Sequence, residues 1–285
     1  MNIRNAERKK AKIKLAIQGS SGSGKSLSSL FIAEGLTGDL SKVIVIDTEN
    51  GSADLYAHHG DYKVLSIQAP FTPEKYIKAI EVCVKAGAEC IIIDSISHAW
   101  SNLLEYHSNL TGNSFTNWNK ITPRHLSFIN KMMDAPVHII ATMRVKQDYV
   151  LNQKDGKYIP EKVGLKAIQR DGVDYEFTLV FDLDIKHNCT CSKDRTGLFM
   201  DQPEFKITSE TGIKIINWCN QGIPLENVKS QILDCQSLEQ LTAVYKKYTA
   251  YYSELTKEFA DQKETIQNNQ FLNLKRVQNG TTNHQ

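Results

Sequence analysis

The sequence lacks the features that would place it in a membrane or among proteins that coat nucleic acid. No apolar run approaches the roughly 20 residues that a transmembrane helix needs, and the chain begins with charged side chains rather than a signal-peptide core. We therefore expect a cytoplasmic protein without a membrane segment. The net charge is only +2, from 34 basic and 32 acidic residues, which excludes a uniformly basic surface. Any nucleic acid must then bind at one local face.

The six cysteines lack the paired Cys-x-x-Cys spacing of a disulfide framework or a zinc ribbon. Cys83 and Cys90 lie in apolar segments, where a reduced thiol packs like a small hydrophobic side chain. Cys189 and Cys191 are close enough in sequence to contribute to a zinc site, but no second pair stands at ligand spacing. We favour two ordinary strand residues there and predict no metal held by cysteine.

Apolar segments alternate with helix signals through the first half of the chain. Strands are predicted over residues 12–18, 43–46, 90–93 and 137–141. A helix follows the first strand; another begins at Thr72-Pro73 and ends at Gly87, and Thr122-Pro123 repeats the start signal. This order predicts an α/β fold with a mostly parallel sheet covered by helices on both faces. Strict alternation from Tyr175 to Ile185 predicts that antiparallel strands continue the sheet.

The pattern of apolar residues changes near residue 222. Apolar residues from Leu238 to Phe259 recur in steps of three and four, which predicts one helical stripe, and a shorter stripe from Leu225 to Ile232 precedes it. We therefore divide the chain into a core of residues 1–221, a helical hairpin of 222–266 and a loose tail of 267–285. The hairpin is either an appendage packed on itself or on the core, or a surface for a protein partner or a second copy.

One motif predicts a phosphate site. Residues 19–26 match the P-loop pattern Gly-x-x-x-x-Gly-Lys-Ser, after a predicted strand and before a predicted helix. The glycines let consecutive N–H groups turn inward on phosphates, and the helix N-terminus adds partial positive charge. Lys25 is expected to reach the β- and γ-phosphates of ATP, and Ser26 to hold Mg²⁺. The residues expected to bind the nucleotide are Gly19, Ser20, Ser21, Gly22, Ser23, Gly24, Lys25 and Ser26.

Two acidic residues complete the predicted ATPase site. Asp94 follows the apolar run of residues 90–93, so it is expected at the carboxyl edge of a buried strand as the second magnesium group. Glu49 follows the strand of residues 43–46, where a carboxylate is placed to orient the attacking water. We favour this catalytic role over that of a solvated loop acid.

At these residues the chain resembles the RecA-like branch of P-loop ATPases. Asp47-Thr48-Glu49 is similar to the segment that carries the catalytic glutamate there, and Asp94-Ser95 is similar to the end of Walker B. Thr142 stands where that branch has a γ-phosphate-sensing glutamine, and its hydroxyl reaches less far than an amide. Lys193 and Arg195 resemble a Lys-x-Arg element that such ATPases project into a neighbouring subunit's nucleotide. The other interpretation of this pair is a solvated basic turn.

The combined pattern over about residues 12–200 resembles phage-encoded RecA-like ATPases, often labelled AAA-family ATP-binding proteins. The resemblance implies a homo-oligomer, either a ring or a filament, in which ATP hydrolysis is weak until subunits assemble or DNA binds. It also implies a role in phage DNA recombination or replication in the bacterial cytoplasm, related to short RecA-like single-strand annealing ATPases. His98, just past Asp94, either contacts the γ-phosphate or plays no part in the site.

A basic stretch follows the fourth predicted strand. It pairs local positive charge with Tyr149 and Tyr158, a combination that suits single-stranded DNA, although a solvated hairpin explains it equally well. Our leading hypothesis is an ATPase that couples ATP to single-stranded DNA binding and self-assembly. The alternative is a nucleotide-gated assembly or loader protein that acts on protein partners. The candidate DNA contacts are Arg144, Lys146, Lys154, Lys157, Lys162, Lys166 and Arg170.

Overall fold

The computed structural model describes residues 11–154, 157–220, 225–248 and 252–280. Within these ranges, the side chains of 149–154, 157–163, 252–253 and 270–280 are not described. The chain divides into two compact units, one of residues Lys12–Ile216 and one that contains the helices after Asn217. In the described residues no helix is both long and apolar enough to cross a membrane.

The larger unit is built on one sheet, in which the described strands follow the order β3-β2-β4-β5-β1-β7-β8 and β6 pairs only with β5. The strands from β3 to β7 run parallel to one another, which confirms the predicted parallel sheet. The strand bounds are β1 Lys14–Gly19, β2 Val43–Asp47, β3 Lys63–Ser66, β4 Cys90–Asp94, β5 His138–Lys154, β6 Lys157–Ala167, β7 Leu179–Leu183 and β8 Cys189–Asp194.

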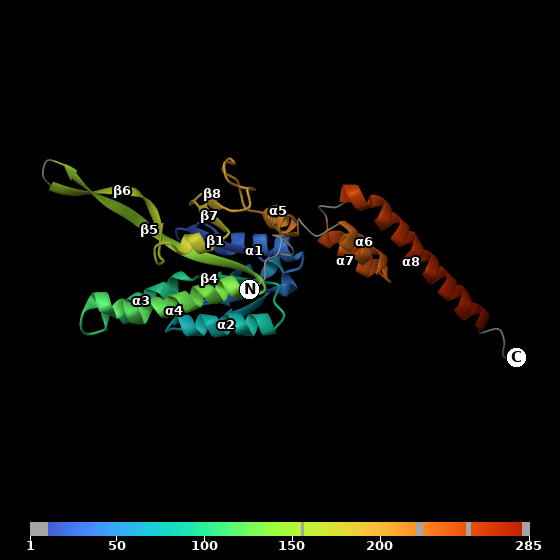
Figure 1. The fold of residues 1–285 in the computed structure, drawn as a ribbon, viewed down its shortest axis with the longest axis horizontal. Coiled ribbons are helices and arrows are strands. Elements are labelled where there is room, and N and C mark those ends of the chain that lie inside the picture. Colours follow the sequence, from blue (N-terminus) through green and yellow to red (C-terminus); the bar gives the residue numbers. More distant parts are fainter. Residues whose placement is uncertain (1–10, 155–156, 221–224, 249–251, 281–285) are drawn as a thin grey trace, which may run out of the picture. The chain divides into compact units, whose positions relative to one another are not determined.

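Helices cover both faces of this sheet (Figure 1). Helices α2 and α4 pack their apolar side chains on one face, around Tyr76 and Phe128, while α1 packs against β1, β2, β4 and β5 on the other. The helix bounds are α1 Lys25–Thr37, α2 Pro73–Lys85, α3 Ser97–Ser108, α4 Ser114–Asp134 and α5 Ser209–Asn220, with short 3₁₀ turns at η1 Leu40–Lys42, η2 Ser52–His59 and η3 Val173–Glu176.

Helices α1 and α5 approach each other most closely at two glycines. A Cβ atom on Gly35 would lie 2.0 Å from the carbonyl oxygen of Ser209 and 2.7 Å from the Cα of Gly212. No side chain fits in that space, so glycine is required at this crossing. Ser209 also donates a hydrogen bond of 2.5 Å to the carboxylate of Glu34, which fixes α5 beside α1.

The edge of the sheet differs from the predicted pattern in one respect. Strand β8 is antiparallel to β7, as expected, but β7 itself runs parallel to β1. The alternation of Phe177, Leu179 and Phe181 reflects only one of its faces, because Val180 on the other face is buried as well. A strand covered on both faces belongs with the parallel part of the sheet.

The predicted helix start at Thr122-Pro123 is wrong. Helix α4 begins nine residues earlier, at Ser114 instead of Pro123, and the side chain of Asn113 accepts hydrogen bonds from the N–H groups of Phe115 and Thr116. Pro123 therefore lies inside α4. A proline inside a helix removes one backbone hydrogen bond, and burial of the apolar face of α4 offsets that loss.

Two groups at the amino-terminal end of the sheet are buried. The Nδ1 atom of His138 accepts a hydrogen bond of 3.1 Å from the N–H of Ile13, and burial lowers the pKa of His138 to about 3. The ammonium group of Lys14 donates to the carbonyl oxygens of Ala135 and Val137, and burial lowers the pKa of Lys14 to about 8. Both groups anchor the start of β1 and β5.

The helices of the smaller unit are α6 Leu225–Leu233, α7 Leu238–Lys247 and α8 Tyr252–Gly280. The predicted single stripe from Leu238 to Phe259 is divided between α7 and α8, because α7 ends at Lys247 and Tyr248 turns into the shared core. The predicted tail is also wrong from 267 to 280, where α8 continues. Good helix formers such as Gln, Leu, Lys and Arg in that segment outweigh its asparagines.

The apolar stripes of α6, α7 and α8 face one another. Val228, Ile232, Leu241, Leu255 and Phe259 are buried in a common cluster. This packing favours the interpretation of a helical appendage with its own core. The described exposed apolar side chains in this unit are few, Leu233 and Tyr245 being the large ones.

Candidate nucleotide site

The P-loop lies between β1, which ends at Gly19, and α1, which begins at Lys25. Gly22 and Gly24 have φ angles of 78° and 86°, in the left-handed region that glycine adopts without strain. Gly24 is also the N-cap of α1 and has no side chain to fill the loop. The loop thus joins a strand to a helix N-terminus, which is the context that the sequence predicts for a phosphate cradle.

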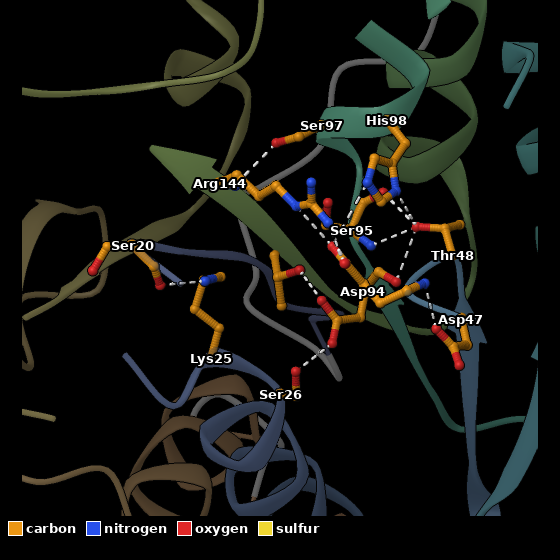
Figure 2. A network of polar contacts seen from close by, with 12 residues as sticks. Ser20, Lys25, Ser26, Asp47, Thr48, Asp94, Ser95, Ser97, His98 and Arg144 are labelled. Atoms are coloured by element: carbon orange, nitrogen blue, oxygen red, sulfur yellow. Dashed lines mark hydrogen bonds and ion pairs between the residues drawn. The ribbon is translucent and has the colours of Figure 1, made fainter. Parts of the chain in front are cut away.

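Lys25 points across this loop. Its ammonium group donates a hydrogen bond of 2.8 Å to the carbonyl oxygen of Ser20. Burial lowers the pKa of Lys25, the charges of Asp94 and Glu49 oppose that shift, and Arg144 adds to it. Lys25 therefore lies near the charges of Asp94, Glu49 and Arg144, and Figure 2 shows Lys25, Asp94 and Arg144 in this part of the site.

Asp94 stands at the end of β4 and is only 4% exposed. It accepts hydrogen bonds of 2.5 Å from the hydroxyl groups of Ser26 and Thr142, one on each carboxylate oxygen. Burial raises the pKa of Asp94, and these two hydrogen bonds oppose the shift. The structure thus places Ser26 and Asp94, the two predicted magnesium groups, in direct contact. Thr142 contacts Asp94 from the neighbouring strand β5.

The loop has the properties of a site for a polyphosphate and its metal ion. The hydroxyl oxygen of Ser23 is buried and has no hydrogen-bond partner among the described residues. A Cβ atom on Gly19 would lie 2.5 Å from that oxygen, so only glycine leaves the cradle open. Hydroxyl and carboxylate oxygens, such as those of Ser26 and Asp94, are the ligands that Mg²⁺ prefers. The residues present therefore fit both a nucleoside triphosphate and its magnesium ion.

Glu49 follows β2, next to β4 in the sheet, where Asp47 pairs with Asp94. Its backbone N–H donates a hydrogen bond of 2.6 Å to the side chain of Asp47. Its carboxylate forms a bidentate ion pair with Arg144, with Nε at 2.9 Å from Oε1 and Nη2 in contact with Oε2. Both oxygens of the predicted catalytic carboxylate are therefore held by one guanidinium group.

His98 contacts Thr48 (Figure 2) and also lies near Glu49. Its Nδ1 is 2.8 Å from the hydroxyl of Thr48, and its Nε2 is 3.9 Å from Glu49 Oε1. The ring also stacks on Phe71, with 4.8 Å between the centroids. Burial lowers the pKa of His98, whereas the charge of Glu49 raises it. This histidine is thus part of the network around Glu49.

Thr48 ties β2 to β4 at this edge. Its N–H donates to the carbonyl of Asp94 at 2.9 Å, and its hydroxyl accepts from the N–H of Ser95 at 2.9 Å. The side chain of Thr48 thereby fixes the backbone on which Asp94 is presented.

Lys193 and Arg195 lie far from the P-loop of their own chain. Lys193 pairs with Val180 near the start of β7, whereas the P-loop begins beside Leu183 at its end, three residues or roughly 10 Å further on. Lys193 and Arg195 each donate a hydrogen bond of 2.7 Å to a backbone carbonyl of the η3 turn. The structure therefore does not bring this pair to the predicted site within one subunit.

The predicted DNA stretch forms a long hairpin. Beyond Arg144, β5 pairs only with β6, and the two strands project from the sheet as a ribbon (Figure 1). Of the candidate contacts, the side chain of Lys146 is exposed, Lys166 pairs with Asp171 at 2.8 Å, and Arg144 is bound to Glu49. One nitrogen of Arg170 is buried with no hydrogen-bond partner in the described part of the chain. The side chains of Lys154, Lys157 and Lys162, with Tyr149 and Tyr158, lie outside the described residues.

Comparison with known families decides what kind of domain surrounds this site. The family described as an AAA domain matches residues 11–206, which is more than half of the chain. The chain belongs to the AAA domain family. Membership implies a nucleotide-binding P-loop ATPase domain, in agreement with the α/β fold and the position of the P-loop. A separate comparison with curated proteins finds no significant match to the chain.

Two parts of the site escape prediction from the sequence. Arg144 is counted there with the basic stretch, because nothing in the local pattern indicates that it reaches back to a residue 95 positions earlier. Thr48 carries no signal of its own in the sequence, although it links β2 to β4. The described residues include no cluster of three or more His, Cys, Asp or Glu side chains that could hold a metal ion.

Proposed function

We propose that the protein binds ATP with Mg²⁺ and hydrolyses it. The observation that carries the proposal is the convergence of Lys25, Ser26, Asp94 and Glu49 from three neighbouring parts of the sheet edge around one open glycine loop. A structural glycine turn does not need a buried carboxylate bound to the hydroxyl that follows its lysine. Ligands of open α/β sheets bind at this carboxyl edge of the strands.

Each residue of the proposed site would have its own role in phosphoryl transfer. Lys25 would contact the β- and γ-phosphates, while Ser26 and Asp94 would hold the magnesium ion, which neutralises phosphate charge when bound. Glu49 would orient and polarise the attacking water, and Thr142 and His98 stand beside the two carboxylates. Glu49 must first exchange its contact with Arg144 for one with water, since that ion pair occupies both of its oxygens.

We further propose that ATP is coupled to single-stranded DNA and to self-assembly, in the manner of the RecA-like phage proteins that the sequence resembles. The support is the β5–β6 hairpin, which carries most of the basic stretch and is continuous with the strand that holds Thr142 and Arg144. A projecting basic ribbon is suited to follow a phosphate backbone. Lys193 and Arg195 would complete a neighbouring subunit's site, because they lie away from their own.

The test is ATP hydrolysis measured with and without single-stranded DNA. We expect DNA to increase turnover at least severalfold and the increase to fall as salt rises. If DNA neither binds nor stimulates, the DNA part of the proposal is overturned. The loader alternative would then be favoured if ATP changes the binding of a protein partner to residues 222–266.

A further inference from the structure

The turn between β7 and β8, residues 184–188, lies against the P-loop. Leu183 at the end of β7 pairs with Gly19 at the end of β1. A Cβ atom on Gly24 would lie 3.0 Å from Nδ1 of His187, and one on Gly22 would lie 3.5 Å from Cδ1 of Ile185. Two side chains of the turn thus border two glycines of the phosphate cradle.

Hydrogen bonds within the turn hold its backbone. The carboxylate of Asp184 accepts hydrogen bonds of 2.8 Å from the N–H groups of Lys186 and Asn188, and the backbones of Asp184 and Asn188 are also joined. His187 has a φ of 64°, so its backbone is left-handed, and its ring lies beside Gly24 of the P-loop. Lys206 donates to the carbonyl of Lys186 from outside the turn.

The chemistry of this pair differs from that of the rest of the site. Ile185 is 63% exposed, and the imidazole of His187 is exposed as well, although the P-loop beside them is polar. Phosphates gain nothing from an aliphatic neighbour. A nucleoside does, because the faces of its base are apolar, and ligand pockets combine such apolar walls with a few polar groups. The turn also follows the strand next to β1, at the edge where ligands of these sheets bind.

We propose that Ile185 and His187 form the wall of the site that contacts the nucleoside part of a bound nucleoside triphosphate. Ile185 covers a face of the base, and the His187 ring packs against the nucleoside with its polar edge toward the P-loop. This inference rests on the proposed function, since it adds a contact surface for the nucleoside of the same nucleotide whose phosphates the P-loop would bind. It makes the β7–β8 turn the part of the site that distinguishes a nucleotide from a bare polyphosphate.

The experiment compares two probes, ATP and inorganic tripolyphosphate, each with Mg²⁺. The variants are Ile185→Ser, His187→Asn and the double variant, Asn being chosen because it tolerates left-handed backbone. For the double variant we expect the dissociation constant for ATP to rise roughly tenfold and that for tripolyphosphate to stay within about twofold, the size expected for lost ring and aliphatic packing. Thr190→Ala, an exposed position on β8, is the matched control and should alter neither.

Each other outcome has a defined meaning. Equal losses for ATP and tripolyphosphate would show that the turn supports the phosphate loop itself and would overturn the proposed nucleoside wall. Unchanged ATP binding in the double variant, with an unchanged melting temperature, would overturn it too. If the unaltered protein binds neither probe, the proposed function fails before this inference is reached.

Discussion

Arg144 on β5 holds both carboxylate oxygens of Glu49 at the end of β2. The two residues are 95 positions apart, and Nε of the arginine lies 2.9 Å from Oε1 of the glutamate. The pair is partly open to solvent, with 46% of the Arg144 side chain and 23% of the Glu49 side chain exposed. In the proposed mechanism Glu49 orients the attacking water, and Arg144 competes with that water for the carboxylate oxygens.

Replacing Arg144 by Ala should raise basal ATP turnover about three- to tenfold without DNA. The carboxylate is then free to polarise water, and the cost is small because a partly exposed ion pair contributes only about 1 kcal/mol. The measurement is steady-state phosphate release. Lys146→Ala, two residues along β5 and exposed, is the control. A loss of turnover in Arg144→Ala with unchanged ATP binding would mean that Arg144 assists the reaction.

Glu49→Gln should reduce ATP turnover at least a hundredfold while the dissociation constant for ATP changes little. The amide keeps the shape of the side chain but does not act as a base toward water. Binding is followed by calorimetry and turnover by single-turnover hydrolysis. Activity comparable to that of the unaltered protein would remove Glu49 from the mechanism. Glu74→Gln, in an exposed pair with Arg124, is a suitable control.

Asp94→Asn should abolish magnesium-dependent turnover and yet raise the melting temperature by about 2–5 °C. Burial raises the pKa of Asp94, which means that the ionised form costs folding free energy above the unfolded pKa. Asn removes that charge and still pairs with the hydroxyls of Ser26 and Thr142. Thermal unfolding without nucleotide checks this expectation, and a lower melting temperature would contradict it.

Stability should fall in acid because of His138. Its pKa is about 3 in the folded chain against 6.5 when unfolded, so below pH 6.5 the unfolded chain takes up a proton that the folded chain does not. The loss is about 2 kcal/mol at pH 5 and grows until the pH nears 3. His138→Asn keeps an acceptor for the N–H of Ile13 and should flatten this dependence. Denaturant unfolding between pH 7 and pH 4 is the measurement, and parallel curves for the two proteins would contradict the assignment.

Mixing two inactive variants tests whether Lys193 and Arg195 act on a neighbouring subunit. Glu49→Gln lacks the base and Arg195→Ala lacks the distant cation. If the cation acts across an interface, mixed assemblies contain sites with Glu49 from one subunit and Arg195 from the next. We expect the mixture to recover a measurable fraction of normal turnover under conditions that allow subunit exchange. No recovery in demonstrably mixed assemblies would argue against action between subunits.

The sequence predicts which residues have a chemical role in the site better than it predicts which side chains contact one another. The P-loop, Ser26 and Asp94 are local patterns tied to strand ends, and the parallel sheet brings Ser26 and Asp94 together as expected. Arg144 could not be assigned to Glu49, because that pairing depends on sheet order and side-chain direction. No sequence motif indicates the proposed wall of Ile185 and His187, because it depends on where the β7–β8 turn lies relative to Gly22 and Gly24 in the folded chain.

Helix boundaries differ from the prediction where one local signal competes with another. Thr122-Pro123 has the form of a helix start, but the cap at Asn113 begins α4 first and burial keeps the proline inside. The steps of three and four from Leu238 to Phe259 suit one helix, yet Tyr248 is buried where α7 ends. In both cases, tertiary burial outweighs the local pattern.

The two parts of strand β5 should differ in how well their backbone amides are protected from exchange with solvent. From Ile139 to Arg144 it is flanked by β1, and from His138 to Ala141 by β4, whereas from Val145 onward its partner among the described strands is β6 alone. Backbone amides of the inner part should exchange with solvent through global unfolding, and those of the outer part through local opening of the hairpin. The border falls at Arg144. We therefore expect the outer ribbon to lose its pairing before the inner strand does, and Arg144, which contacts Glu49, marks the boundary between the two parts.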